Sequence, residues 1–138
     1  MNVIILAFFS MILILRSFLL FRYLHETELF TKQDPYMNLW TTSTADVLPM
    51  QRTKTHQNGG RSATWGQKFT ISIADLATEY FYVEVMDEND YTSDRLIGKA
   101  KFACSDLSST VTEAWIRIYQ ESGKDAGEVL IAASIESI

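Results

Sequence analysis

Short runs in which apolar and polar residues alternate constrain this chain most strongly. The pattern is clearest in segments 68–73 and 80–86, whose alternating apolar residues are Phe69, Ile71 and Ile73 in the first and Phe81, Val83 and Val85 in the second. Side chains on a strand point to opposite faces in turn, so this spacing puts the apolar residues of each run on one face. Each run therefore predicts a β-strand with one buried face.

Further short runs suggest that strands occupy most of the chain after residue 35. They are Tyr36 to Thr42, Gln51 to Gln57, Leu96 to Ala103, Ala114 to Ile118 and Glu128 to Ile135, with turn residues such as Asn58-Gly59-Gly60 and Ser122-Gly123-Lys124 between them. A short helical turn is expected only within 72–80 or 105–112. With 138 residues, 47% of them hydrophobic, the chain can bury one ordinary core. We therefore expect one all-β domain, an antiparallel sandwich.

The first 24 residues form an apolar leader with several interpretations. Val3 to Leu15 contains no charge, and after Arg16 and Ser17 the apolar run resumes from Phe18 to Phe21. A membrane anchor would suit this length, since a helical span needs about 20 mostly apolar residues. A first strand covered on both faces would suit the same composition. A cleaved signal peptide is less well supported because no basic residue precedes the apolar run, and a wrongly assigned N-terminus is a further alternative.

Charge and cysteine content exclude several classes of protein. The formal net charge is −5, so nucleic acid would be repelled at long range and is not expected as a partner. Cys104 is the only cysteine, which excludes an intramolecular disulfide and a multi-cysteine zinc site. No nucleophile has a recognisable base nearby, and His25 and His56 are the only histidines. We therefore do not expect an enzyme.

Two acidic segments are the best candidates for a functional site. Glu28 to Tyr36 reads ELFTKQDPY, and Met86 to Gly98 reads MDENDYTSDRLIG. Each lies next to a strand-like run, so both can form loops at one end of a sandwich. Calcium takes about six to eight oxygen ligands, preferably several carboxylates. The two segments therefore predict a calcium site at one end of the domain.

Four segments in order resemble C2 domains, the calcium- and phospholipid-binding modules first noted in protein kinase C. They are LHETELFTKQDPYM, RTKTHQNGGRSATWGQKFTISI, YFYVEVMDENDYTSDRLIG and GEVLIAASI, and they extend from Leu24 to Ile135. The resemblance implies an eight-stranded antiparallel Greek-key β-sandwich. Eight strands require one before Glu28, which assigns part of Leu13 to Phe21 to the first strand. The implied division is an apolar leader at 1–12, a possible anchor or extension, and a C2-like domain at 13–138.

The resemblance also implies which loop residues would bind calcium. The family's five acidic positions fall on Glu28, Asp34, Asp87, Asn89 and Arg95. Three of these are carboxylates, and Asn89 still offers a neutral oxygen. Arg95 cannot coordinate a cation, although Asp90 and Asp94 stand one residue away as substitutes. In the alternative interpretation, Arg95 forms an internal ion pair with Asp87 or Asp94 and the domain is calcium-independent.

A basic surface is the second candidate site. Arg52, Lys54 and His56 share one face if they lie on a strand, and their positive ends could then converge on a phosphate. In phosphoinositide-binding relatives, basic residues on this strand and its neighbour line a concave groove. Arg52 and Lys54 match that pattern and are the predicted lipid-binding residues, whereas Asn38 and Trp40 depart from it. A solvated polar face is the simpler alternative.

The function expected from the resemblance is that of a membrane-targeting module. It would bind anionic phospholipid, with calcium on the acidic loops as the cofactor, and would be cytoplasmic and peripheral at membranes. Bound calcium would cancel the negative field of the loops so that anionic lipid can approach. The competing expectation is a calcium-independent protein-interaction or scaffold domain, in which the loops or strand edges recognise another polypeptide.

Overall fold

The structure is all-β, and every strand pair in it is antiparallel. The computed structural model describes residues 11–22, 33–47, 50–60 and 65–137. Its strands are β1 (Met11–Arg22), β2 (Pro35–Thr41), β3 (Gln51–Arg52), β4 (Phe69–Ile73), β5 (Tyr80–Asp87), β6 (Arg95–Ala103), β7 (Thr112–Tyr119) and β8 (Asp125–Ser137). Two 3-10 turns, η1 (Thr42–Thr44) and η2 (Cys104–Asp106), complete the described elements. The predicted all-β antiparallel class is confirmed.

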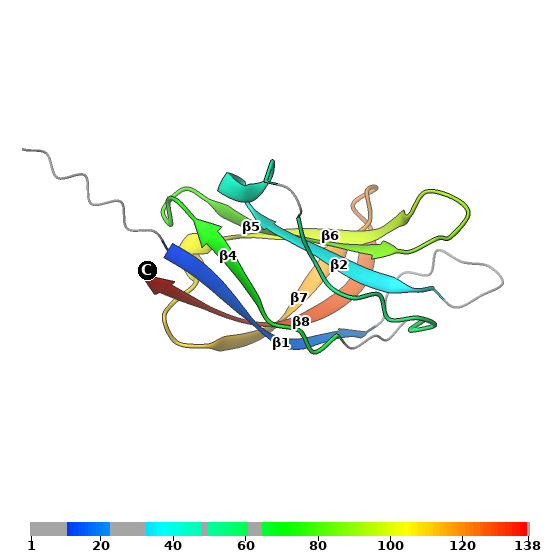
Figure 1. Ribbon diagram of the computed structural model, residues 1–138, viewed down its shortest axis with the longest axis horizontal. Coiled ribbons are helices and arrows are strands. Elements are labelled where there is room, and N and C mark those ends of the chain that lie inside the picture. Colours follow the sequence, from blue (N-terminus) through cyan, green and yellow to red (C-terminus); the bar gives the residue numbers. More distant parts are fainter. Residues whose placement is uncertain (1–10, 23–32, 48–49, 61–64, 138) are drawn as a thin grey trace, which may run out of the picture.

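The strands form one ladder that folds back on itself into two layers. Their order is β3-β2-β5-β6-β7-β8-β1-β4. In the described residues β6 and β7 are paired at one position, Lys99 with Tyr119. The sheet passes from one layer to the other at this pair. As a result β2, β5 and β6 lie across from β1, β7 and β8 (Figure 1). The inner faces of the two layers enclose the core.

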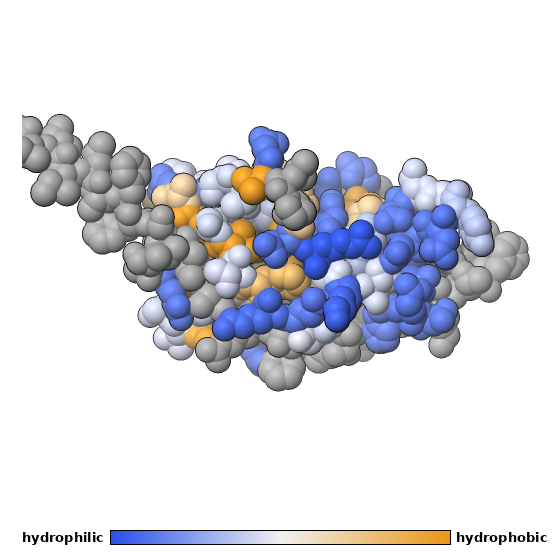
Figure 2. All heavy atoms as spheres, viewed as in Figure 1, coloured by the Kyte–Doolittle hydropathy of each residue, from blue (hydrophilic) through white to orange (hydrophobic). Residues whose placement is uncertain are grey.

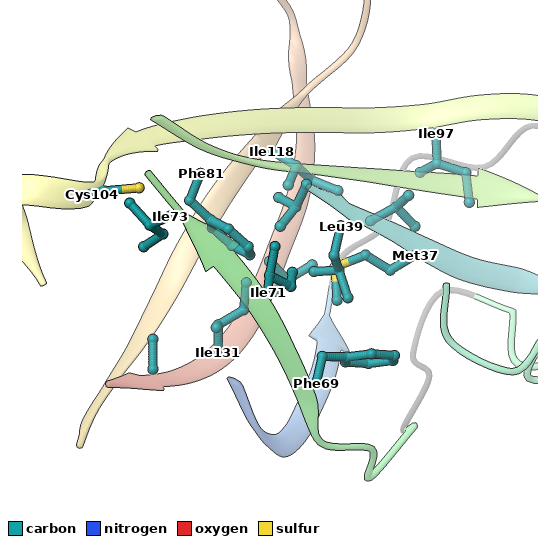
Figure 3. Close-up of a cluster of buried hydrophobic side chains, with 14 of the residues drawn as sticks. Met37, Leu39, Phe69, Ile71, Ile73, Phe81, Ile97, Cys104, Ile118 and Ile131 are labelled. Atoms are coloured by element: carbon teal, nitrogen blue, oxygen red, sulfur yellow. The ribbon is translucent and has the colours of Figure 1, made fainter. Parts of the chain in front are cut away.

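The core consists of the alternating side chains that the sequence singled out, together with partners from β2, β6, η2, β7 and β8. Burial alternates along β4 and β5 as predicted. Figure 3 shows that the buried side chains from both layers meet between the strands. The labelled residues are Met37, Leu39, Phe69, Ile71, Ile73, Phe81, Ile97, Cys104, Ile118 and Ile131. Because each large aliphatic or aromatic side chain contributes about 1.5–3 kcal/mol when buried, this cluster is the main source of stability.

The part of the apolar leader that the structure describes, Met11–Arg22, lies inside the sheet as β1. It pairs with β8 from Met11↔Ser137 to Arg22↔Glu128, with an irregularity between Arg16 and Leu20. Its other edge pairs with β4, from Met11↔Ile73 to Leu15↔Phe69. Residues 1–10 lie outside the described ranges, and none of the helices that the structure describes is long and apolar enough to span a membrane.

The strand predicted at 51–57 is wrong in its extent, because regular pairing ends at Arg52. Beyond it, Thr53 donates its backbone N–H to Met37 O at 2.9 Å, and His56 donates to Pro35 O at 3.0 Å. The three-residue interval from Thr53 to His56 thus lies opposite the two-residue interval from Met37 to Pro35, as in a β-bulge. The backbone N–H of Lys54 leaves the ladder altogether and donates to Gln67 Oε1 at 2.6 Å.

Both segments that were expected to hold a short helical turn contain one. Segment 105–112 overlaps η2, and 72–80 contains a single turn at 75–79 between the ends of β4 and β5. In that turn Thr78 and Glu79 donate backbone N–H groups to Asp75 O, at 3.3 and 3.0 Å. The turn η1, which follows β2 directly, was not expected from the sequence. A run such as Thr-Thr-Ser-Thr carries no apolar periodicity that would signal it.

Candidate functional site

The two acidic segments of the sequence meet at one end of the sandwich, here called the apex and comprising residues 33–36, 55–60 and 87–95. Pro35, the first residue of β2, pairs with Asp87, the last residue of β5. The β5–β6 loop extends from this end (Figure 1), where mostly hydrophilic residues gather on the face shown in Figure 2. The prediction that the two loops lie together is therefore confirmed for the described residues.

Asp34 and Asp87 are joined directly. The backbone N–H of Asp34 donates to Asp87 Oδ1 at 2.8 Å. The backbone N–H of Glu88 donates in return to Asp34 O at 3.0 Å. Asp87 is completely buried, at 0% exposure, while Asp34 is half-buried. These residues therefore fasten the start of β2 to the end of β5.

A third segment is attached through the side chain of Asp34. Its Oδ1 accepts the backbone N–H of Asn58 in the turn at 58–60. Gln33 and Gly60 exchange two further hydrogen bonds, one backbone to backbone at 3.0 Å and one from Gln33 Nε2 at 3.1 Å. Asn58 has φ 55° and Gly60 has φ 63°, backbone conformations that Asn and Gly adopt most readily. The predicted Asn-Gly-Gly turn thus forms one side of the apex.

Asp94 organises the inside of the β5–β6 loop. Its Oδ1 accepts the backbone N–H of Asn89 at 2.9 Å, and its Oδ2 accepts the hydroxyl of Tyr36. The Asn89 N–H and then the Tyr36 hydroxyl lower the pKa of Asp94 below its usual value, against the opposing effect of burial. Burial raises the pKa of Tyr36, and the hydrogen bond to Asp94 and its charge raise it further. At neutral pH the phenol therefore remains a donor and the carboxylate an acceptor.

The predicted lipid-binding residues do not form the basic strand that the sequence suggested. The Arg52 guanidinium lies over the Tyr36 ring, 3.5 Å from its centroid, and its Nη2 is 3.6 Å from Glu88 Oε2. Its charge is thus directed toward the acidic loop. Lys54 is exposed on the segment beyond β3, and His56 is half-buried. The bulge after Arg52 explains why these side chains do not follow one continuous strand face.

The remaining predicted residues are distributed over the β5–β6 loop. Asn89 donates from Nδ2 to Asp87 O and to Ser93 O, both at 3.3 Å. Arg95 lies directly opposite Asp87 in the β5–β6 register, and its predicted internal ion pair stays a prediction. Asp90 is exposed. Beside it Tyr91 is 100% exposed, a position that the sequence analysis did not single out.

The oxygen atoms at the apex test whether calcium fits. Both oxygens of Asp94 and one oxygen each of Asp34 and Asp87 already accept hydrogen bonds from the protein. In the ranges that the structure describes, no group of three or more His, Cys, Asp or Glu side chains could hold a metal ion. Calcium takes about six to eight oxygens. The described residues therefore do not fit a calcium cage, and Glu28, the other predicted ligand, lies outside them.

A groove on the outer face of the sheet is a second candidate site, and the sequence analysis missed it. Its volume is about 650 Å³, and its floor includes the rings of Trp40 and Tyr82, stacked at 5.4 Å with 6° between their planes. Lys99 and Lys101 from β6 and Arg117 from β7 line its side. The spacing of Lys99 and Lys101, two residues apart on a strand, could have predicted from the sequence that both lie on one face. Their proximity to Arg117 depends on the fold-over between β6 and β7.

The cations that line the groove have local partners. Lys99 Nζ pairs with Glu121 Oε2 at 2.9 Å, and Arg117 pairs with Asp125 and, at 3.3 Å, with Glu128. Lys101 Nζ lies 4.8 Å from the centroid of the Tyr80 ring. Glu84 is the acidic residue in the lining. The groove therefore combines an aromatic floor with partly exposed positive charges on one side.

Comparisons with known proteins agree with this architecture. A C2 domain of a plant Extended Synaptotagmin 1, known from its solved structure, superposes with a TM-score of 0.80 at 14% identity, covering 94% of this chain and 95% of that one. Human GIVD cytosolic phospholipase A2 gives 0.78 at 21% identity, over 94% of this chain and 17% of that enzyme. These likenesses show the fold alone.

The sequence itself matches known proteins over most of its length. Synaptotagmin-4 of Arabidopsis thaliana is 26% identical over 108 residues, which are 74% of this chain and 18% of that protein. The chain thus spans less than a fifth of the length of this curated relative. Residues 20–118 match the C2 domain family. Because this match extends over more than half of the chain, the protein belongs to the C2 domain family.

Proposed function

We propose that this protein is a membrane-targeting C2 module that binds anionic phospholipid through the groove on its outer sheet face. The observation that carries the proposal is the position of Lys99, Lys101 and Arg117 beside the Trp40 and Tyr82 rings. Phosphate groups are attracted to such cations, and aromatic rings suit the boundary between headgroups and acyl chains. The C2 family and the synaptotagmin relatives support this choice.

The local ion pairs do not prevent lipid binding at the groove. The side chains of Glu121 and Asp125 are 77% and 54% exposed, so their pairs with Lys99 and Arg117 are solvent-screened. Such surface pairs contribute only about 0–1 kcal/mol each. Several phosphates in an anionic membrane contribute about 1 kcal/mol per basic residue close to the surface. An anionic membrane can therefore displace the two exposed partners, Glu121 and Asp125.

The finer features of the proposal follow the family resemblance. They include an eight-stranded Greek-key sandwich at 13–138, with residues 13–21 in its first strand, and a cytoplasmic, peripheral location. Lys54 is retained as a lipid-contacting residue because it is exposed beyond β3. Calcium has no step in this mechanism. Its predicted ligands are Glu28, Asp34, Asp87 and Asn89. This assignment stays a prediction, which the binding experiment tests.

Sedimentation with liposomes tests the proposal. The wild type is expected to pellet with vesicles containing phosphatidylserine, and to stay in the supernatant with phosphatidylcholine alone. The double change Lys99→Ala and Lys101→Ala should weaken binding by roughly thirtyfold, since two basic contacts are lost. Lys124→Ala is the matched control, an exposed lysine in the β7–β8 turn outside the groove lining. No pelleting of the wild type with or without calcium would exclude the membrane function.

The calcium prediction is tested by the same assay. Pelleting in calcium and in chelator should be equal if the apex does not bind the metal at the membrane. A requirement for calcium that is lost in Asp34→Ala and Asp87→Ala would instead support the predicted ligands. It would then be the acidic apex, not the groove, that contacts the headgroups.

A protein-interaction domain is the second candidate function, and the strand edges favour it. In the described part of the chain, β6 and β7 share a single register pair and then diverge along the groove. Edges with few ladder partners can accept an added strand from another polypeptide. Tyr80, Trp115 and Tyr119 are exposed on β5 and β7, as aromatic residues in interfaces often are. This candidate would gain support if the wild type failed to bind every vesicle composition.

A further inference from the structure

Arg52 contacts all three segments that form the apex. Its guanidinium lies 3.5 Å from the centroid of the Tyr36 ring at the start of β2. Its Nη2 donates to Thr55 Oγ1 at 3.4 Å and lies 3.6 Å from Glu88 Oε2 in the β5–β6 loop. Thr55 in turn donates its hydroxyl to Glu88 Oε2. One side chain of β3 therefore links β2, the segment after β3 and the β5–β6 loop.

The network continues from Tyr36 to the far side of the β5–β6 loop. The Tyr36 hydroxyl donates to Asp94, which also accepts the Asn89 backbone N–H at 2.9 Å. The planar guanidinium can lie over the Tyr36 ring and still direct N–H groups toward a carboxylate beside it. Arg52 therefore contacts the Tyr36 ring, whose hydroxyl donates to Asp94 near the end of the β5–β6 loop. It also lies beside Glu88 at the start of the same loop.

Electrostatics explain why a cation is needed at this place. The apex gathers the carboxylates of Asp34, Asp87, Glu88, Asp90 and Asp94. Like charges so close together repel one another, most strongly where burial lowers the effective dielectric constant. Arg52 offsets part of this repulsion, and its charge helps to lower the pKa of Asp94 after the effects of the Asn89 N–H and the Tyr36 hydroxyl. An internal cation thus performs a role that a metal ion would otherwise perform.

We propose that Arg52 is a positioning residue that holds the apex in its folded arrangement in place of a metal ion. The contacts of its guanidinium account for the position of each segment without an external ligand. Four of these carboxylates, Asp34, Asp87, Glu88 and Asp94, accept hydrogen bonds from the protein, which is consistent with this role. The order of the β5–β6 loop is then a property of the chain alone, independent of calcium. This inference does not depend on lipid binding.

Hydrogen exchange of the 138-residue chain, followed by mass spectrometry, tests the proposal. In the wild type, peptides covering 86–95 should exchange at the same rate in calcium and in chelator. Arg52→Gln should accelerate exchange of these peptides by roughly tenfold, since it removes both the ring contact and a charged hydrogen-bonding group. Arg52→Lys should lie between them, because it keeps the charge but not the planar stack.

Two further variants separate the proposed role from general destabilisation. Arg117→Gln is the control, because Arg117, like Arg52, forms ion pairs with carboxylates. Its partners are Asp125 and Glu128, which lie outside the apex. This variant should leave exchange at 86–95 unchanged. Glu88→Gln weakens the same contact from the other side and serves if Arg52→Gln does not fold. Exchange over the core strand 81–85 reports that each variant is folded.

Two results would overturn the proposal. The first is slower exchange at 86–95 when calcium is added to the wild type, which would mean that a metal ion sets the loop. The second is unchanged exchange in both Arg52→Gln and Glu88→Gln.

Discussion

The backbone N–H of Asp34 donates to the buried carboxylate of Asp87 over 2.8 Å, although the two residues are 53 positions apart in the chain. This hydrogen bond closes the end of the sheet between β2 and β5, where Pro35 and Asp87 pair. An aspartate that would be assigned to metal binding from its position is therefore also a structural acceptor. The structural role can be measured separately because it needs no ligand.

Replacement of Asp87 should destabilise the protein even without calcium. Asp87→Ala leaves the half-buried Asp34 N–H without its charged acceptor, which should cost about 1–3 kcal/mol in the free energy of unfolding. Asp87→Asn, which keeps an acceptor oxygen, should cost less. Urea unfolding in chelator provides the measurement, and the exposed neighbour Asp90→Ala is the control, expected within about 0.5 kcal/mol of the wild type. Equal stability of Asp87→Ala and the wild type would contradict the structural role.

Glu79 should make stability depend on pH in the acid range. Burial raises its pKa, but hydrogen bonds from the Asp75 and Ser43 backbone N–H groups outweigh this effect and hold it below the ordinary value. A lowered pKa in the folded state stabilises the protein above the unfolded pKa, and this contribution is lost as pH falls through the folded pKa. The wild-type free energy of unfolding should therefore begin to drop near the unfolded pKa of about 4.3 and fall further as pH decreases through the lower folded pKa.

The matched variant for this effect is Glu79→Gln, which cannot ionise. Its stability should lie below that of the wild type near neutral pH and approach it in acid, as the wild-type carboxylate takes up a proton. Asp106→Asn, at an exposed carboxylate of η2, is the control. A constant difference between Glu79→Gln and the wild type across the range would show that Glu79 is not the titrating group.

Cys104 should be an unreactive thiol in the folded protein. It is 0% exposed in the core, and burial, followed by the charge of Glu79, raises its pKa to about 11. Because the thiolate is the reactive form, a thiol reagent at about pH 8 should modify the native protein far more slowly than the protein in urea. Rapid labelling of the native protein would contradict the burial of Cys104.

Gly98 should tolerate no larger residue. A Cβ added there would lie 2.7 Å from the Cβ of Ala126 and 3.1 Å from the side chain of Ile118. Gly98→Val therefore forces β6 and β8 apart and should cost about 1–3 kcal/mol, or more, in urea unfolding. Lys101→Val, on the exposed face of the same strand, is the control and should change stability little. Equal effects of the two changes would argue against the close packing.

Local pattern was sufficient for the strands of the core. Alternation in 68–73 and 80–86 predicted β4 and β5 with the correct buried faces. The reason is that successive side chains of a strand point to opposite faces, so the pattern depends on adjacent residues alone. The same reasoning overextended β3. Nothing in Gln51 to Gln57 indicates that Lys54 donates its N–H to Gln67, and this distant contact ends the regular pairing.

The loops at the apex were also predictable, but their chemistry was not. Motif order brought Asp34 and Asp87 to one end of the domain, as observed. The sequence assigned Arg52 to a lipid groove, which stays a prediction, and gave no sign that the folded chain places it on the Tyr36 ring beside Glu88. Likewise, no local signal brings Arg117 next to Lys99 and Lys101. Contacts between side chains of distant strands depend on register and fold-over, which the chain acquires only when its layers pack.

The sequence by itself determined the all-β class, the strands with alternating faces and the C2 family, because hydrophobic periodicity and motif order are properties of the linear chain. Only the tertiary structure decided which charges meet. It set Arg52 among the apical carboxylates and formed the groove between β6 and β7. The physical reason is that electrostatic and hydrogen-bonding energies fall off over a few ångströms, so they depend on distances that sequence separation does not specify.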